Sequence, residues 1–117
     1  MAHKFTLFIY NNYTTAVYNA YRFALAALEQ GYELSYIFLW RDSVVVANQY
    51  LELAGDEINL QSLWQELSLK YNLKLQVCRA SASRRGIQEK NLAPNFSFGS
   101  IGVLSQYLTT EYKLMSF

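Results

Sequence analysis

Cys78 is the residue of this sequence best suited to covalent chemistry, and it is the chain's one cysteine. The thiolate form of cysteine is a nucleophile, and a nearby positive charge lowers the pKa of the thiol. Arg84 and Arg85 follow Cys78 in the same polar segment, so a loop that returned them toward the sulfur would activate it. Two plainer interpretations stay open at this point: Cys78 is an inert buried residue, and both arginines are solvated surface residues.

Other kinds of catalytic or binding site find little support in the sequence. The single histidine, His3, has no companion histidine and no second cysteine, so neither a metal site nor a Ser-His-Asp triad is expected. The polar segment 11–15 lacks the glycines of a dinucleotide-binding turn, and no phosphate-binding lysine motif occurs. We therefore expect neither a cofactor nor a metal.

Strand and helix patterns alternate along the chain and must position these residues. Short runs rich in β-formers predict strands at 5–10, 34–39, 73–78 and 112–115, with a short additional strand at 96–98. Apolar residues at helical spacing predict helices at 16–28, 44–50, 60–71 and 101–108. Gly31 is expected to end the first helix, and Asn59 and Ser100 to cap the third and fourth. The polar segment 79–94 is predicted to be a loop.

The order strand, helix, strand, helix, strand predicts a single-domain α/β protein over residues 1–117. Its sheet should be open and parallel, with four or five strands and helices on both faces. In such sheets reactive groups gather beyond the carboxyl ends of the strands, which here selects the segments 11–15, 40–43 and 78–86. Alternation along the third strand predicts that Cys78 faces the opposite side of the sheet from Val77.

Composition indicates an oligomeric protein of a reducing compartment. The chain has 117 residues, 52% of them hydrophobic and 16% aromatic, and its ten tyrosines and seven phenylalanines are more than so small a core easily covers. The net charge of +1 provides no basic footprint for nucleic acid. A lone cysteine excludes an internal disulfide, and the sequence has neither a signal peptide nor the run of about 18 apolar residues that a membrane span needs. We therefore expect a cytoplasmic protein that binds neither membranes nor nucleic acid directly.

Three motifs resemble those of the DsrE/TusD family of sulfur-relay proteins. The segment 78–87 has a strand-end cysteine, small residues at Ala80 and Ala82, and then Arg84-Arg85-Gly86 followed by an aliphatic residue. The segment 37–49 is similar to the family's second strand with its Arg-x-x-Val and Ala-Asn-Gln continuation, and 99–104 is similar to its Ser-Gly-Leu-Gly helix start. The resemblance covers essentially the whole chain.

The resemblance implies a sulfurtransferase that holds sulfane sulfur as a persulfide on Cys78 and passes it to a downstream carrier. It implies that Arg84 and Arg85 favour the anionic sulfur, and that the small Ala80 and Ala82 leave room for a partner's cysteine loop, with Gly86 completing the motif. It also implies a three-layer flavodoxin-like or Rossmann-like fold, upstream and downstream carrier proteins, and a hexamer with two paralogous subunits, a homo-oligomer being the alternative. The TusD branch serves 2-thiolation of the wobble uridine in tRNA, and the DsrE branch serves dissimilatory sulfur oxidation.

Two other functions stay open on the residues alone. The chain could be a non-catalytic structural or interaction subunit of the same kind of complex, with an inert cysteine. It could also bind a small ligand in the crevice at the strand ends, although no phosphate or metal motif supports this. Fast alkylation of Cys78 near neutral pH would argue against the structural-subunit interpretation.

Overall fold

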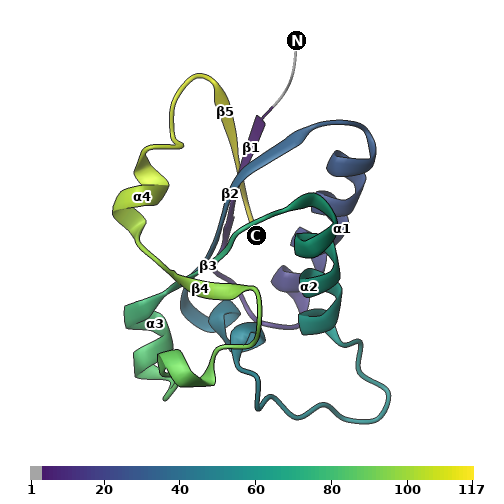
Figure 1. The fold of residues 1–117 in the computed structure, drawn as a ribbon, viewed down its shortest axis with the longest axis vertical. Helices are drawn as coiled ribbons and strands as arrows, with labels where there is room; N and C mark the ends of the chain where they lie inside the picture. The colour runs from purple at the N-terminus through teal and green to yellow at the C-terminus, as the bar shows by residue number, and fades with distance from the viewer. Residues whose placement is uncertain (1–3) are drawn as a thin grey trace.

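Five parallel strands form the centre of the molecule in a computed structural model that describes residues 4–117. The strands lie in the order β4-β3-β2-β1-β5, and Figure 1 shows helices on either side of them. Their bounds are Lys4–Ile9 (β1), Glu33–Leu39 (β2), Leu75–Cys78 (β3), Phe96–Gly99 (β4) and Tyr112–Ser116 (β5). The predicted single open parallel sheet is confirmed, and the short strand expected at 96–98 is part of it.

Four α-helices in the described part of the chain are divided between the two sides of the sheet. On one side, α1 (Thr15–Glu29) and α2 (Leu60–Tyr71) contact each other; on the other lies α4 (Ile101–Ser105) (Figure 1). The short α3 (Arg79–Arg84) follows the carboxyl end of β3, and its buried Ala82 belongs to the same apolar cluster as the buried residues of α1 and α2. Two 3₁₀ turns, η1 (Arg41–Ala47) and η2 (Glu89–Asn91), follow β2 and α3. The prediction of helices on both faces is confirmed. None of the helices among residues 4–117 is long and apolar enough to cross a membrane.

The helix boundaries follow from local side-chain chemistry. The Asn59 side chain accepts a hydrogen bond from the Ser62 N–H at 3.0 Å, and the Ser100 hydroxyl accepts one from the Val103 N–H at 3.1 Å. Both are N-cap contacts that satisfy an otherwise unpaired amide of the first turn. Gly31 follows α1 at a φ of +88°, a left-handed conformation that glycine adopts without steric cost. The three predicted helix boundaries are confirmed.

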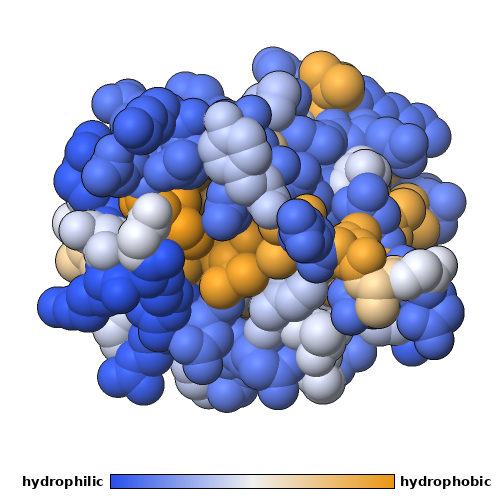
Figure 2. Space-filling view, turned by 90° about the horizontal axis from the view of Figure 1, so that it is seen from below, coloured by the Kyte–Doolittle hydropathy of each residue, from blue (hydrophilic) through white to orange (hydrophobic). Residues whose placement is uncertain are grey.

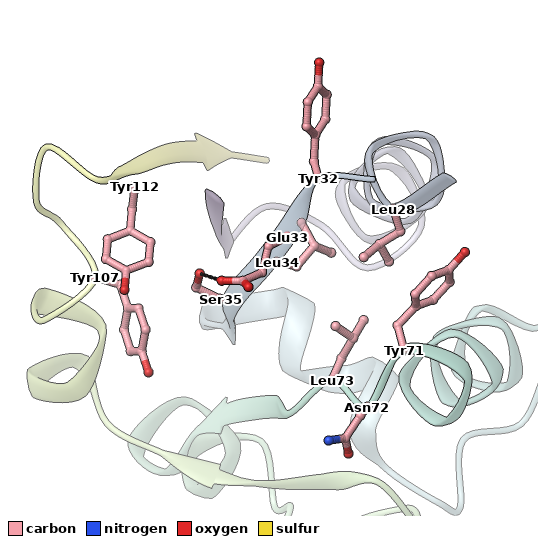
Figure 3. A pocket seen from close by; sticks show the side chains of 10 residues that line it. All are labelled: Leu28, Tyr32, Glu33, Leu34, Ser35, Tyr71, Asn72, Leu73, Tyr107 and Tyr112. Atoms are coloured by element: carbon pink, nitrogen blue, oxygen red, sulfur yellow. Dashed lines mark hydrogen bonds between the residues drawn. The ribbon is translucent and has the colours of Figure 1, made fainter. Parts of the chain in front are cut away.

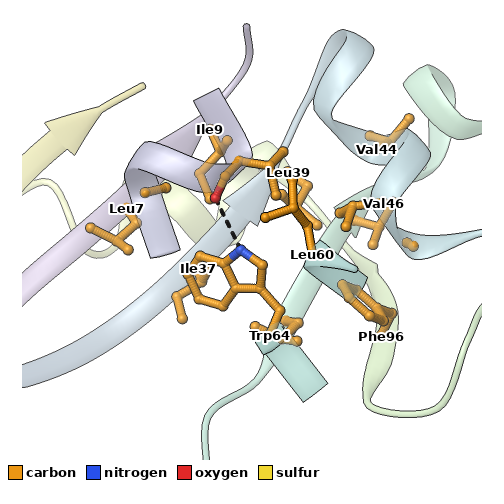
Figure 4. Packing of buried hydrophobic residues seen from close by; sticks show 14 of the residues in the cluster. Leu7, Ile9, Ile37, Leu39, Val44, Val46, Leu60, Trp64 and Phe96 are labelled. Atoms are coloured by element: carbon orange, nitrogen blue, oxygen red, sulfur yellow. Dashed lines mark hydrogen bonds between the residues drawn. The ribbon is translucent and has the colours of Figure 1, made fainter. Parts of the chain in front are cut away.

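The main core lies between the sheet and the α1–α2 layer. The parallel register sets Leu7 beside Ile37 and Leu39 beside Val77, and these side chains point toward the helices. Trp64 on α2 is 2% exposed, and its indole N–H donates to the Val17 carbonyl oxygen at 3.2 Å (Figure 4). Full burial of each large aliphatic side chain contributes about 1.5–3 kcal/mol, so this face fixes the sheet on which the site is built.

The opposite side of the sheet carries a second, mainly aromatic cluster, which we call the aromatic face. Its members are Phe8, Tyr36, Phe38, Trp40, Cys78, Leu104 and Tyr107. The alternation predicted for the third strand is confirmed, because Val77 belongs to the main core whereas Cys78 packs on the aromatic face. α4 has only five residues against the 15 of α1, and Phe8 and Trp40 stay half-buried. This side of the sheet is therefore the less completely covered one.

The prediction of a loop over residues 79–94 was wrong in its first part. The chain forms α3 directly after Cys78 and then turns through η2. Alanine is the strongest helix former, and the inner side of α3 buries Ser81 and Ala82, which are 1% and 0% exposed. The polar residues that suggested a loop are the solvent-facing positions of a short helix.

Two other predicted helices differ in extent from the observed ones. The helix expected at 44–50 is the 3₁₀ turn η1, which begins at Arg41, since Ser43 already stabilises the end of β2 with its hydroxyl group. The helix expected at 101–108 ends at Ser105, and Leu108 is 49% exposed. Leu108 therefore lacks the burial that would continue a helix against the sheet.

Candidate functional site

Cys78 occupies the junction between a strand and a helix. It is the last residue of β3 and the N-cap residue of α3, and its thiol is free and half-buried. The strand order places this junction at the carboxyl edge of the sheet, where parallel sheets collect their functional groups. Of the predicted site residues, Cys78 lies where the sequence indicated.

A glycine on the neighbouring strand, next to Cys78, lets two other side chains pack closely. Gly99 on β4 pairs with Cys78 in the parallel register. A Cβ atom at Gly99 would come within 2.7 Å of the Tyr36 hydroxyl oxygen and within 2.8 Å of the Gln76 Cβ. Real Cβ atoms do not approach so closely, so the absence of a side chain lets Tyr36 and Gln76 pack across the strand.

Aromatic rings form the floor on which the thiol packs. Phe8 lies between Phe38 and Trp40, with ring centroids 6.2 Å and 5.4 Å away, and Tyr36 stacks on Tyr107 at 5.0 Å. Burial raises the pKa of the Tyr36 hydroxyl, while the hydrogen bond it donates to the Ser100 carbonyl oxygen partly offsets this shift. The floor of the site is therefore mainly apolar and aromatic.

The carboxyl edge of the sheet combines apolar and charged groups. Figure 2 views the molecule from below, the end at which η1 and α3 lie, and shows apolar side chains in a band between hydrophilic ones. Such a mixture suits a surface that desolvates a reactive group only when a partner covers it.

Polar contacts fasten α3 to η1. The Arg85 guanidinium donates to Asp42 Oδ1 at 2.7 Å and to the Ser81 carbonyl oxygen at 2.9 Å. The backbone N–H of Arg41 donates to Ser81 Oγ at 2.9 Å. Because α3 begins at Cys78, these contacts also fix the backbone that carries the thiol.

Arg84 and Arg85, the predicted arginine pair, make different contacts, and neither pairs with the thiol. The Arg85 side chain is bound to Asp42, whereas the Arg84 side chain is exposed and forms no hydrogen bond or ion pair within residues 4–117. Neither arginine donates a hydrogen bond to Cys78 among the described residues. Ala80 is exposed on α3, whereas Ala82 is 0% exposed and packs in the main core, so the prediction that Ala82 leaves room for a partner's loop was wrong. Gly86 ends the helix at a φ of +75° with its N–H bonded to the Ser83 carbonyl oxygen at 3.1 Å.

Sequence reasoning missed the part played by the residues just after β2. The segment 40–43 was selected by its position at the sheet edge, but no role was assigned within it. In the structure the Arg41 guanidinium carbon lies 4.3 Å from the centroid of the Trp40 ring, and Asp42 binds Arg85. Spacing along the chain could not reveal Asp42 as a partner, because 43 residues separate it from Arg85.

The largest cavity described lies away from Cys78. It has a volume of about 520 Å³ and is lined by residues at the amino ends of β2 and β3, among them Glu33 and Leu73, with Tyr107 and Tyr112 on one side and Tyr71 on the other (Figure 3). Cys78 is not among its lining residues. The described cavity thus gives no support to a small-ligand site at the thiol.

Metal ligands are also not gathered in the described part of the chain. Among residues 4–117, no group of three His, Cys, Asp or Glu side chains is placed to hold a metal ion. His3, the residue on which a metal site or a catalytic triad would have depended, lies outside the described residues.

Comparison with known proteins identifies the family. The model of the DsrE/DsrF-like family matches residues 3–117, and the chain belongs to this family. The chain is 36% identical to sulfurtransferase TusD of Proteus mirabilis and 34% identical to sulfurtransferase TusD of Serratia proteamaculans, each over 110 residues and 85% of both chains.

Two solved structures share the fold. The ychN protein of E. coli superposes with a TM-score of 0.81 at 23% identity over 100% of both chains. The protein MTH1491 of Methanobacterium thermoautotrophicum, a protein of unknown function, gives a TM-score of 0.74 at 10% identity over 98% of this chain and 99% of its own. At these identities the likeness concerns the fold alone.

Proposed function

We propose that this chain is a sulfur-relay sulfurtransferase subunit that carries sulfane sulfur as a persulfide on Cys78. The observation that carries the proposal is a single free, half-buried thiol at the carboxyl end of β3 in a chain of the DsrE/DsrF-like family. The relatives named sulfurtransferase TusD support the same activity.

The chemistry is two successive exchanges at sulfur. The Cys78 thiolate attacks the outer sulfur of a donor persulfide; the donor's S–S bond breaks, its thiolate leaves, and a persulfide forms on Cys78. An acceptor thiolate then attacks the outer sulfur of that persulfide, and the Cys78 thiolate leaves. Each step exchanges one S–S bond for another, so no external oxidant or reductant is consumed.

The single cysteine suits a carrier rather than an enzyme that completes the reaction alone. With no second cysteine in the chain, the persulfide cannot be resolved as an internal disulfide. The sulfur therefore waits until a partner's cysteine reaches it. The exposed positions of Ala80 and Arg84 on α3 leave the outer side of this helix open to such a partner.

The partners we propose are an upstream and a downstream sulfur carrier, with paralogous subunits in a cytoplasmic hexamer. The incompletely covered aromatic face supports assembly, and so do exposed apolar residues on and near α4 and β5: Ile101, Val103, Leu108 and Leu114. The name shared by the relatives supports delivery of the sulfur to tRNA for 2-thiolation of the wobble uridine; sulfur oxidation of the DsrE type is the alternative.

Mass spectrometry of the loaded protein tests the proposal. The protein is incubated with cysteine, a cysteine desulfurase and its sulfur carrier, and its intact mass is measured without reductant. We expect one added sulfur atom on Cys78, removed by dithiothreitol and absent from Cys78→Ser. Loading elsewhere in the chain, or equal relay activity of Cys78→Ser, would contradict the proposal.

One observation favours a second candidate, a structural subunit with an inert cysteine. Cys78 packs against the aromatic face rather than standing free in solvent. This alternative predicts slow alkylation of the native thiol, no sulfur loading, and normal assembly of Cys78→Ser with its partner subunits. The same mass measurement therefore separates the two candidates.

A further inference from the structure

Arg41 has a backbone conformation that its residue type does not favour. Three non-glycine residues among 4–117 have a positive φ: Arg41 at +53°, Asn72 and Asn95. Asparagine tolerates the left-handed region because its short side chain bonds locally, whereas an ordinary residue with a Cβ is strained there. The conformation at Arg41 must therefore be held by its surroundings.

Helix α3 supplies the contact that holds it. The Arg41 N–H donates to Ser81 Oγ at 2.9 Å, and Ser81 is 1% exposed within α3. On the preceding residue, the Trp40 N–H donates to Ser43 Oγ at 3.1 Å. The chain direction after β2 is thus fixed by the helix that begins at Cys78.

The left-handed conformation at Arg41 places its side chain over the ring of Trp40, close to Cys78. The guanidinium carbon is 4.3 Å from the Trp40 ring centroid. Leu39 of β2 pairs with Val77 of β3. Trp40 and Cys78 are the next residues of the two segments, so they lie beside each other at the end of the sheet. Neighbouring strands are about 4.8 Å apart, and both residues pack on the aromatic face.

Three of the arginines around Cys78 have no carboxylate partner in the described chain, and Arg41 is one of them. The charged and titratable side chains on the surrounding segments are those of Arg41 and Asp42 on η1, Arg79, Arg84 and Arg85 on or after α3, Tyr10 after β1, and Tyr36 and Tyr107 of the aromatic face. β4 and α4 contribute none. Asp42, the one carboxylate in this set, is bound by Arg85. Within residues 4–117, Arg41, Arg79 and Arg84 therefore have no carboxylate partner. Arg79 lies 4.3 Å from the ring centroid of Phe98, which packs against the main core, whereas Arg41 lies on Trp40 of the aromatic face, the face that carries Cys78.

We infer that Arg41, held in its left-handed turn by Ser81 and laid on Trp40, supplies the positive charge that stabilises the anionic sulfur of Cys78. This assigns to Arg41 the role that the sequence motif suggested for Arg84 and Arg85. For the thiolate the inference stands on the geometry alone; for the persulfide it rests on the function proposed above. A guanidinium that stays charged at every working pH suits an anion that forms and leaves in each cycle.

The test is the pH dependence of Cys78 alkylation by iodoacetamide. The reagent is uncharged, so removing Arg41 does not change its attraction to the protein, and Cys78 is the one thiol that can react. In Arg41→Gln we expect the midpoint of the rate profile to move upward by roughly half to one pH unit. The rate near neutral pH should fall roughly two- to threefold, because a more basic thiolate is also more nucleophilic.

Further variants separate charge from structure. Arg41→Lys keeps the charge and should restore most of the wild-type midpoint. Arg41→Gly relieves the left-handed backbone, so its Tm should be unchanged or higher while its midpoint shifts as in Arg41→Gln. Arg22→Gln, which removes a guanidinium resting on Tyr18 of α1 on the other side of the sheet, is the matched control and should leave the profile unchanged.

Several outcomes would overturn the inference. One is a wild-type midpoint in Arg41→Gln; another is a larger shift in Arg84→Gln than in Arg41→Gln. A rate that falls equally at every pH, with no shift of the midpoint, would show a change of access rather than charge. The profile is independent of sulfur loading: a shifted midpoint in a protein that takes up no sulfur would keep this inference and refute the proposed function.

Discussion

Cys78 combines two environments that serve a sulfur carrier. Its side chain packs on the aromatic face, while its backbone caps a helix whose outer side is exposed. Apolar packing limits the approach of water and small thiols, and the open helix leaves a path for a partner's loop. We propose that the reactivity of the thiol is then set by Arg41, which has no carboxylate partner in the described chain and lies on Trp40 of the same face.

The hydroxyl group of Ser81 connects α3, the helix that begins at Cys78, to the backbone of Arg41. Ser81→Ala removes the acceptor of the Arg41 N–H, so we expect a loss of about 1 kcal/mol in the free energy of unfolding. The alkylation midpoint of Cys78 should move in the same direction as in Arg41→Gln. Urea unfolding and the iodoacetamide profile measure the two effects. Ser83→Ala, at an exposed position of the same helix, should change neither; an equal effect of both variants would refute the role of Ser81.

Sequence reasoning selected Cys78, the proposed nucleophile, but not Arg41, the positive charge that we propose stabilises its sulfur. Cys78 could be found because its residue type, its position at a strand end and the following motif are all local features. The role of Arg41 depends on a positive φ and on a hydrogen bond to Ser81, 40 residues away in the chain. Neither leaves a pattern in the local sequence.

At the scale of secondary structure, α3 and η1 act as one unit. The Arg85–Asp42 pair is partly exposed, with side-chain exposures of 30% and 68%, so it contributes only about 0–1 kcal/mol. Burial of Ala82 and Ile87, which are 0% and 3% exposed, holds the segment more firmly. The ion pair therefore orients the helix, and apolar packing retains it.

Gly99 provides a prediction about the strand beside the site. Gly99→Ala forces a Cβ against the Gln76 Cβ and the Tyr36 hydroxyl, which should cost roughly 1–3 kcal/mol by overpacking. Gly102→Ala is the matched control: its Cβ would meet only the Ser100 hydroxyl, at 3.7 Å, and alanine should stabilise α4 by up to about 1 kcal/mol. Chemical unfolding of both variants measures the difference. Equal stability of Gly99→Ala and the wild type would show that the close packing is not required.

Most of the strands and helices could be predicted from the sequence, because their patterns are local. Strands and the two long helices carry clear periodic patterns, and their ends carry local caps such as Asn59 and Ser100. α3 was missed because a six-residue helix with one buried side is mostly polar and reads as a loop. The helix predicted at 44–50 differs from the observed η1 because a 3₁₀ turn does not produce the apolar period of 3.6 residues by which α-helices are predicted.

At the scale of the whole molecule, the two sides of the sheet differ in how completely they are covered. Long helices bury one side, whereas the aromatic face has only the five-residue α4 over it, with exposed apolar residues at its margin. The aromatic excess in the composition is explained in part by this cluster.

Assembly can be tested by introducing a charged residue among the exposed apolar residues at the margin of the aromatic face. Ile101 on α4 is 57% exposed and Leu69 on α2 is 71% exposed on the other side of the sheet. Ile101→Asp should weaken association with copies of the chain or with paralogous subunits by at least tenfold, while Leu69→Asp should not. Sedimentation velocity of each variant, alone and co-purified with the subunits, measures this. Loss of assembly in Leu69→Asp alone would move the interface to the opposite side.

Transfer of labelled sulfur in a single turnover tests the central claim most directly. The chain is loaded with radiolabelled sulfur on Cys78, freed of donor, and mixed with an acceptor carrier protein that has one reactive cysteine. The account predicts that the label leaves Cys78 and is found on the acceptor's cysteine in equal amount, and that Cys78→Ser neither takes up nor transfers it. Label that remains on the chain, or that reaches the acceptor equally well in Cys78→Ser, would contradict it.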